Sequence, residues 1–324
     1  MARVSAIVPL YNKATTVRRT MNSITAQSFR DWEVIVVDDG STDEGPATVE
    51  QMNDPRFRLI RQTNAGPGAA RNRGIRESRG EYLAFLDADD EWLPDYLQNA
   101  VDILEGPSRA AAVACLWIDE PGHIKGPVFE GHLREGPMKL EPGLPALRLV
   151  EWLIVFSPCS TVARRQTVER FGGFYDRDGC RYGEDAHLWL KIFLNETCYL
   201  SLKHLAIFHR DASELSNNLS GMRPIEPFLA NPEDVQVVCP QRLQPLLSQF
   251  LSYRAQKTAC LLSYWGDGKA ARQLLRRFSA AGDWRLPWFF PARISSAPFL
   301  TGCVSGLAQV YRTVRSRSAR SGNR

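Results

Sequence analysis

One stretch decides the fold: Tyr82-Leu83-Ala84-Phe85-Leu86-Asp87-Ala88-Asp89-Asp90-Glu91-Trp92, an apolar run that ends abruptly on three aspartates. Behind the turn-prone pair Arg79-Gly80, such a run predicts a buried strand of an α/β sheet. Open α/β sheets bind ligands outside the carboxyl ends of their strands. Asp87 and Asp89 are two residues apart, so in extended backbone they point the same way and can share one cation. Mg²⁺ and Mn²⁺ prefer such oxygen ligands.

The three aspartates can instead form a solvated turn that caps the helix expected after Pro94, because Asp-x-Asp is a short and common pattern. The preceding chain weighs against that alternative. It contains three more strand-like apolar segments, Val4–Leu10, Trp32–Val37 and Phe57–Ile60. Each is followed by a segment with helical features, so four β-then-α units predict a doubly wound, mainly parallel sheet. Polar residues follow every strand and indicate a nucleotide site: Tyr11 and Asn12, Asp38 and Asp39, Asn64, and Asp87 and Asp89.

The phosphate-binding motifs of two large enzyme classes do not occur. No Gly-x-Gly-x-x-Gly follows the first predicted strand, and the chain has no Gly-Lys-Ser/Thr loop. A dinucleotide dehydrogenase and a P-loop enzyme are therefore disfavoured. We expect the cation and an arginine to hold the phosphates. Arg71 is the candidate, because a planar guanidinium suits bidentate contact with phosphate oxygens.

A second acidic segment lies at Tyr182–Phe193, where apolar residues recur at helical spacing. Asp185 precedes Leu188 and Trp189 by three and four residues, so it projects from the same inward face. Carboxylates are avoided on such a face unless they are paired or functional. Acids in the first turn of a helix can also serve only the macrodipole. We expect function for Asp185 and the macrodipole role for Glu184.

Five groups of residues follow one another in order: Pro9-Leu10-Tyr11-Asn12, Val37-Asp38-Asp39-Gly40-Ser41-Thr42-Asp43, Asn64-Ala65-Gly66 with Ala70-Arg71-Asn72, Asp87-Ala88-Asp89-Asp90, and Gly183-Glu184-Asp185. A joint pattern is far more specific than any single motif. Over roughly its first two-thirds, the chain resembles the family 2 glycosyltransferases, which have the GT-A fold.

The resemblance implies a role for each matching residue. Asp39 would accept a hydrogen bond from uracil N3, Asp87 would lie near the ribose, and Asp89 would ligate the metal. Asp185 would be the general base. His209 lies where some GT-A enzymes have a further metal ligand, but the order Phe208-His209-Arg210-Asp211 departs from the family pattern and leaves that ligand open. The nucleotide would be bound by Pro9, Tyr11, Asp39, Arg71 and Asp87.

The resemblance also implies the reaction: a metal-dependent, inverting transfer of a sugar from a nucleoside-diphosphate donor, expected to be UDP-linked, to a hydroxyl of a glycan or lipid-linked acceptor. Mn²⁺ or Mg²⁺ would be the cofactor. Two other classes of protein would show a different pattern. A nucleotidyltransferase would carry a Gly-rich, Arg/Lys-bearing loop after the first strand, which Pro9-Leu10-Tyr11-Asn12 is not. A non-catalytic carbohydrate-binding or scaffold relative would have lost Asp89 or Asp185, and both are present.

Composition sets the broad class. The chain has 324 residues, 44% hydrophobic and 23% charged, with a net charge of +4, which is ordinary for a globular protein and gives no reason to expect a nucleic-acid partner. Seven scattered cysteines without a Cys-x-x-Cys pattern favour reduced thiols and a cytoplasmic setting. The chain starts on a strand-like segment, so no signal peptide is expected.

We expect three regions: a GT-A glycosyltransferase domain at 1–215, a linker at 216–242, and a C-terminal helical appendage at 243–324. Gly266-Asp267-Gly268 splits the expected helical hairpin. The apolar segments Leu286–Pro291 and Pro298–Leu300 and the arginines that follow leave two interpretations open. One is an interfacial segment on the anionic inner face of the plasma membrane. The other is a helix packed on the hairpin with a disordered tail.

Overall fold

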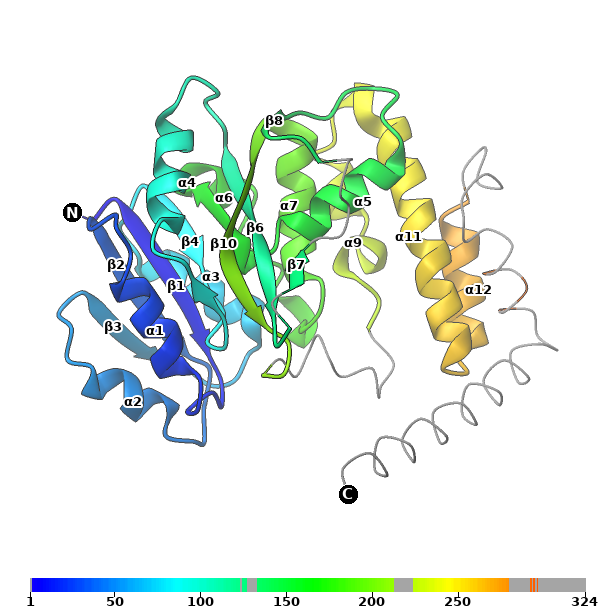
Figure 1. The fold of residues 1–324 in the computed structure, drawn as a ribbon. Helices are drawn as coiled ribbons and strands as arrows, with labels where there is room; N and C mark the ends of the chain where they lie inside the picture. Colours follow the sequence, from blue (N-terminus) through cyan, green and yellow to red (C-terminus); the bar gives the residue numbers. More distant parts are fainter. Residues whose placement is uncertain are drawn as a thin grey trace. The chain divides into compact units, whose positions relative to one another are not determined.

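The computed structural model (Figure 1) describes residues 2–122, 124–126, 133–212, 224–279, 292, 294 and 296. Two compact units can be distinguished. The first takes most of the chain before residue 218. The second takes residues 142–149 and most of the chain after residue 217.

The core of the first unit is a sheet whose parallel half follows the prediction. Its parallel strands are, in sheet order, β3 (Phe57–Arg61), β2 (Trp32–Asp38), β1 (Val4–Leu10) and β4 (Tyr82–Phe85). Val4 lies opposite Trp32 on one side and opposite Tyr82 on the other. The carboxyl ends of these strands therefore meet at one edge. Strands β1, β2 and β4 are buried almost throughout, as expected for strands covered on both faces.

The helices between these strands are also confirmed. Val17, Met21 and Ile24 recur at helical spacing in the first helix, and all three side chains are fully buried. The third helix packs closely on β1, because a Cβ at Gly74 would lie 2.4 Å from Ile7 Cγ2. The helices of this half are α1 (Val17–Thr25), α2 (Gly45–Gln51), α3 (Pro67–Glu77) and α4 (Tyr96–Glu105).

The other half of the sheet is mixed, and two of its four strands, β5 and β10, do not follow from the sequence pattern. Beyond β4 the order is β9 (Thr161–Arg164), β6 (Ala112–Glu120), β10 (Cys198–His209) and β5 (Glu91–Trp92). β9 is antiparallel to both of its neighbours, whereas β10 is parallel to β6 and antiparallel to β5. Neither β5 nor β10 was expected, since β5 has two residues and irregularities between Leu200 and Ala206 interrupt the pairing of β10 with β6.

The segment from Glu120 to Leu147 is rich in Pro and Gly, which predicts loops, but two short strands lie within it. β7 (Ile124–Gly126) pairs with β6, and β8 (Gly136–Met138) pairs with β10. Three-residue strands are too short to give a periodic signal. The remaining elements of this part of the chain are α5 (Ala146–Val155), η1 (Pro158–Ser160), α6 (Arg165–Arg170), η2 (Arg177–Gly179) and α7 (Glu184–Asn195).

The second unit contains the predicted helical hairpin. Its arms are α11 (Gln244–Tyr264) and α12 (Gly268–Arg277), which contact each other. The amide of Ala270 donates to Asp267 Oδ1 at 2.9 Å, so Asp267 caps α12. The short elements α9 (Pro227–Ala230), α10 (Glu233–Gln236) and η3 (Gln241–Leu243) fall largely within the range expected to be a linker. The domain boundaries themselves stay a prediction.

The apolar and arginine-rich C-terminal segment, from Leu286 to Arg324, lies almost wholly outside the described residues. Its interpretation as a membrane-contacting segment therefore stays a prediction. Within the described part of the chain, no helix combines the length and the apolar character needed to cross a membrane.

Candidate active site

The loops after β1 and β2 hold each other through the predicted motifs. The amide of Asn12 donates to Ser41 Oγ at 3.1 Å, and the amide of Thr42 donates to Asn12 Oδ1 at 2.8 Å. Asn12 has a positive φ of 51°, a conformation that Asn tolerates better than most residues. These contacts fix the loop that carries Tyr11, whose side chain is 43% exposed. Pro9 lies within β1 and is half-buried.

Asp39 is buried and fixes the loop that follows β3. Its Oδ1 accepts from the amide of Ala65 and from Gln62 Nε2, both at 2.8 Å, and its Oδ2 accepts from the amide of Gly66 at 2.8 Å. Gly66 has a φ of 93°, and a Cβ there would lie 2.9 Å from the carbonyl oxygen of Cys180. Each carboxylate oxygen can accept more than one hydrogen bond. Asp39 Oδ2 can therefore accept one more, such as a hydrogen bond from the base of a nucleotide.

The three aspartates after β4 form a tight turn in which the amide of Asp90 donates to the carbonyl of Asp87 at 3.0 Å. Asp89 Oδ2 lies 2.9 Å from Lys13 Nζ. Burial raises the pKa of Asp89, and the charge of Asp87 raises it further, while Lys13 lowers it in part. Burial is thus the main reason that charge on Asp89 is unfavourable, and the carboxylate of Asp87 adds repulsion to it.

Asp90 is the most deeply engaged of the three and was not singled out from the sequence. Its Oδ1 accepts from the amide of His209 at 2.9 Å, and its Oδ2 accepts from the thiol of Cys159 at 3.1 Å. Burial, followed by the charges of Asp87 and Asp89, raises the pKa of Asp90 to about 8. The contact with His209 exists because β10, which ends at His209, pairs with β5, the strand that directly follows Asp90.

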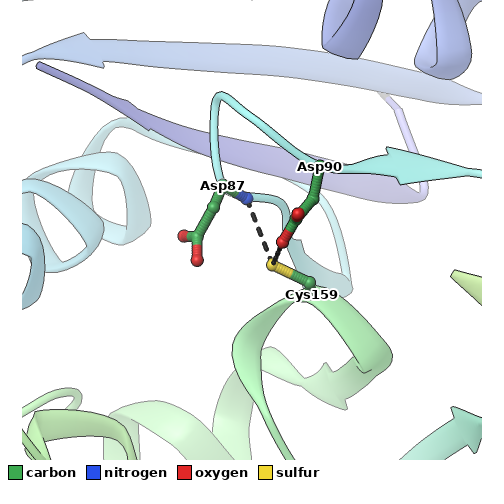
Figure 2. A group of neighbouring side chains, drawn as sticks. All are labelled: Asp87, Asp90 and Cys159. Carbon is green, nitrogen blue, oxygen red and sulfur yellow. Dashed lines mark hydrogen bonds between the residues drawn. The ribbon is translucent and has the colours of Figure 1, made fainter. Parts of the chain in front are cut away.

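Cys159 joins the two ends of the turn (Figure 2). Its Sγ donates to Asp90 and accepts from the amide of Asp87 at 3.4 Å. In Figure 2 the carboxylate of Asp90 points toward the sulfur, whereas the carboxylate of Asp87 points away from it. Burial raises the pKa of Cys159 well above its usual value, so the thiol stays protonated and serves as a donor.

The donor atoms here suit a hard divalent cation. One ligand atom from each of Asp87, Asp90 and Cys159 lies within 4.8 Å of the others. A protonated thiol is a poor ligand for Mg²⁺ or Mn²⁺, which take carboxylate oxygens. Burial first, and the neighbouring carboxylates second, raise the pKa values of Asp89 and Asp90. A divalent cation would offset the second of these effects, so the carboxylates fit such an ion. The ring Nε2 of His209 lies 2.7 Å from Glu91 Oε1, so the imidazole pairs with a carboxylate of β5. A role of His209 as a further metal ligand stays open.

Arg71 connects the aspartate turn to α7. Its Nη2 donates to Asp87 Oδ1 at 2.6 Å, and its Nη1 donates to Glu184 Oε1 at 2.8 Å. The side chain of Arg71 is only 4% exposed. Both terminal nitrogens are thus engaged by carboxylates, which favours a positioning role over the phosphate contact predicted from the sequence. That contact stays a prediction.

Glu184 differs from the sequence-based expectation. We expected it to serve only the helix macrodipole, but it is buried and paired with Arg71. Loss of one partner of a buried ion pair leaves an uncompensated charge, which costs about 3–5 kcal/mol. The helix-favouring acid is therefore also an anchor for the start of α7.

Asn72, next to Arg71 on α3, holds the segment that leads to α7. Its Oδ1 accepts from the amide of Phe174 at 2.8 Å, and its Nδ2 donates to the carbonyl of Phe174 and to Asp176 Oδ2. Gly68, one turn earlier, lies so close that a Cβ would be 2.5 Å from the carbonyl oxygen of Tyr175. The first half of α3 therefore holds residues 174–176, in the segment that leads to α7.

Asp185 lies in the first turn of α7, beside Glu184, and is half-buried. Leu188 and Trp189, on the face predicted to point inward, are fully buried. Burial raises the pKa of Asp185 to about 7, with a further contribution from the charge of Glu184 that Arg71 offsets only in part. Such a carboxylate can accept a proton near neutral pH.

This geometry can be compared with known proteins. Residues 5–164 match the family model described as Glycosyl transferase family 2. This part of the chain is a family 2 glycosyltransferase domain. The segments described above from β1 to β9 fall within the match, while α7 lies beyond it.

A relative of this family 2 chain is the succinoglycan biosynthesis protein ExoW of Rhizobium meliloti, which is 33% identical over 187 residues. The match covers 51% of the chain and 56% of ExoW. The chain spans about half of the length of the curated relatives it matches.

Solved structures show the same fold. S. aureus TarS 1–349 in complex with UDP-GlcNAc superposes with a TM-score of 0.60 and 19% identity, covering 93% of the chain and 92% of that TarS fragment. The mannosyltransferase PcManGT from Pyrobaculum calidifontis, in complex with GDP-Man and Mn²⁺, superposes with a TM-score of 0.52 and 22% identity, covering 98% of the chain and 84% of PcManGT. The family 2 chain therefore has a GT-A-type fold.

Lys13, Asp90 and Cys159 were missed when the family 2 site was derived from the sequence. Cys159 was treated as one of seven scattered cysteines, and Lys13 was given no role. The only available signal was that Asp90 continues the acidic run and that Lys13 directly follows Asn12.

Proposed function

We propose that this protein is a metal-dependent inverting glycosyltransferase that moves a sugar from a nucleoside-diphosphate sugar, expected to be UDP-linked, to a hydroxyl of a glycan or lipid-linked acceptor in polysaccharide synthesis. One observation carries the proposal. Arg71 donates both to Asp87, in the aspartate turn after β4, and to Glu184, in the first turn of α7. The turn assigned to the donor is therefore held close to Asp185, the residue assigned to the acceptor.

The donor is assigned to the edge of the sheet where β1, β2 and β4 end. Asp39 would receive the uracil N3–H, Asp87 would lie near the ribose, and Pro9 and Tyr11 would border the base. The immobilised loops after β1 and β2 support this assignment, because a preorganised site loses less entropy on binding. UDP-GlcNAc bound to TarS and GDP-Man bound to PcManGT support a nucleotide-sugar donor.

Asp89, with Asp87 or Asp90, would hold Mn²⁺ or Mg²⁺. When bound, such an ion supplies Lewis-acid neutralisation of the departing diphosphate. The crowded negative charge of the turn and the Mn²⁺ in PcManGT support this assignment.

Asp185 is the proposed general base. It would take the proton of the acceptor hydroxyl, whose oxygen attacks the anomeric carbon on the face opposite the diphosphate. As the new glycosidic bond forms, the bond from the anomeric carbon to the diphosphate oxygen breaks, and the configuration is inverted. One carboxylate is enough, because the nucleoside diphosphate leaves without needing protonation by a general acid.

A donor screen tests the proposal. The full chain is incubated with UDP-, GDP- and TDP-linked sugars and oligosaccharide or lipid-linked acceptors, with Mn²⁺, Mg²⁺ or EDTA, and release of the nucleoside diphosphate is measured. We expect acceptor-stimulated release with at least one donor, and its loss in EDTA. Equal release with EDTA and with the metals would overturn the metal dependence. Retention of anomeric configuration in the product would overturn the inverting mechanism.

Glu184→Gln is expected to shift the pH dependence of transfer. The amide can still accept from Arg71, but the negative charge that raises the pKa of Asp185 is gone. The base must be deprotonated, so kcat/KM of the wild type should rise with pH through about 7. In Glu184→Gln the same rise should occur at lower pH. If Glu184 had a purely structural role, the change would lower kcat/KM at every pH, and the pH at which kcat/KM is half-maximal would stay the same.

A further inference from the structure

Lys13 is the cation placed on the carboxylate of Asp89. Its Nζ lies 2.9 Å from Asp89 Oδ2 and also donates to the carbonyl of Ala212 at 2.7 Å. The side chains of Lys13 and Asp89 are 19% and 11% exposed. The pair is therefore mostly removed from solvent, and salt screens it less than it would a surface pair.

The backbone on both sides of Lys13 is fixed. The amide of Asn12 donates to Ser41 Oγ, and the amide of Ala14 donates to Asp43 Oδ2 at 2.7 Å. The carbonyl of Lys13 itself accepts from the amide of Val17 at the start of α1. A change of partner for the ammonium must therefore come from the flexible four-carbon stem, which can reach several acceptors from one anchor point.

The neighbouring cations have other tasks. Arg71 is buried between Asp87 and Glu184. Arg19 donates to the backbone carbonyl of Asp89, not to its carboxylate, and its Nε lies 3.3 Å from Glu91 Oε1. Among these three cations, Lys13 is thus the one that pairs with the carboxylate of Asp89, which is proposed to ligate the metal.

We propose that Lys13 and the divalent cation are alternative partners of the Asp89 carboxylate, and that Lys13 passes to the diphosphate oxygens when donor and metal bind together. This inference rests on the metal site proposed above. An ammonium on Asp89 opposes a free metal ion, because it occupies a lone pair and cancels negative charge. Lysine is also an established partner of phosphate. Lys13 therefore makes metal binding depend on the diphosphate, which is a coupling between two ligands.

The test compares Mn²⁺ binding by the wild type and by Lys13→Met, with and without UDP, by electron paramagnetic resonance of free Mn²⁺. Without UDP, Lys13→Met should bind Mn²⁺ about three- to tenfold more tightly than the wild type. The addition of UDP should raise the Mn²⁺ affinity of Lys13→Met by a smaller factor than it raises that of the wild type. Lys13→Arg, which keeps the charge, should stay close to the wild type without UDP. Lys203→Met removes a charge from an exposed position on β10 and should change neither value.

The outcomes separate this inference from the function on which it rests. Equal Mn²⁺ affinity in the wild type and Lys13→Met, at a site that Asp89→Ala removes, would overturn the role of Lys13 and leave the metal site standing. No Mn²⁺ binding that depends on Asp89, with or without UDP, would overturn the metal site and the role of Lys13 together. Thermal unfolding verifies that each variant is folded, and Lys13→Gln gives a second neutral side chain for the same comparison.

Discussion

Asp185→Asn is expected to bind the nucleotide sugar like the wild type and to lose transfer by about 10²- to 10⁴-fold, the contribution of a general base. The amide is nearly the same size as the carboxylate but cannot take the proton of the acceptor hydroxyl. Donor affinity should persist, because the Arg71 bridge runs through Glu184 and Asp87 and does not include Asp185. Calorimetric titration of the donor and single-turnover transfer measure the two quantities separately.

A loss of transfer in Asp185→Asn should not come from unfolding, and a matched control variant tests this. The pKa of Asp185 is raised by burial, so its negative charge at pH 8 is unfavourable to the folded state, and a neutral amide should keep or raise the midpoint of thermal unfolding. Asp178→Asn is the matched control, because Asp178 is exposed and has a φ of 56° that Asn also accepts. Near-normal transfer by Asp185→Asn would show that another group is the base.

Asp89→Ala is expected to abolish metal-dependent donor binding, with a loss of metal affinity of at least about 100-fold. The physical reason is the loss of a carboxylate from a turn whose crowded acids favour a divalent cation. Binding of UDP in the presence of Mn²⁺, against the same titration in EDTA, measures the effect. In the wild type the metal should strengthen UDP binding, and in Asp89→Ala the two titrations should coincide.

The fold of Asp89→Ala should survive, because burial raises the pKa of Asp89 and already disfavours its charge. The change also leaves Lys13 without its carboxylate partner, so the thermal unfolding midpoint should fall by more than that of Asp102→Ala, a matched change at an exposed position on α4. A variant that keeps metal-dependent UDP binding would refute the ligand role of Asp89, and attention would turn to Asp87 and Asp90.

Most of the first half of the sheet followed from local pattern. β1, β2, β3 and β4 are apolar and end in polar turns, so strand boundaries could be predicted within about one or two residues. β10 could not be predicted in this way. Its pairing with β6 is irregular between Leu200 and Ala206, and its place is set by strands that come much earlier in the chain.

The sequence by itself determined the class of fold, the edge of the sheet where polar groups gather, and the identity of Asp39, Asp89 and Asp185 as candidates. These are local properties, because the end of a strand and the first turn of a helix are encoded by adjacent residues. Only the tertiary structure decided their partners. Arg71 meets Glu184 across 113 positions of sequence, and Lys13 reaches Asp89 from the loop after β1. Burial and charge, and hence the pKa of each acid, depend on such long-range approaches of backbone, which no local pattern records.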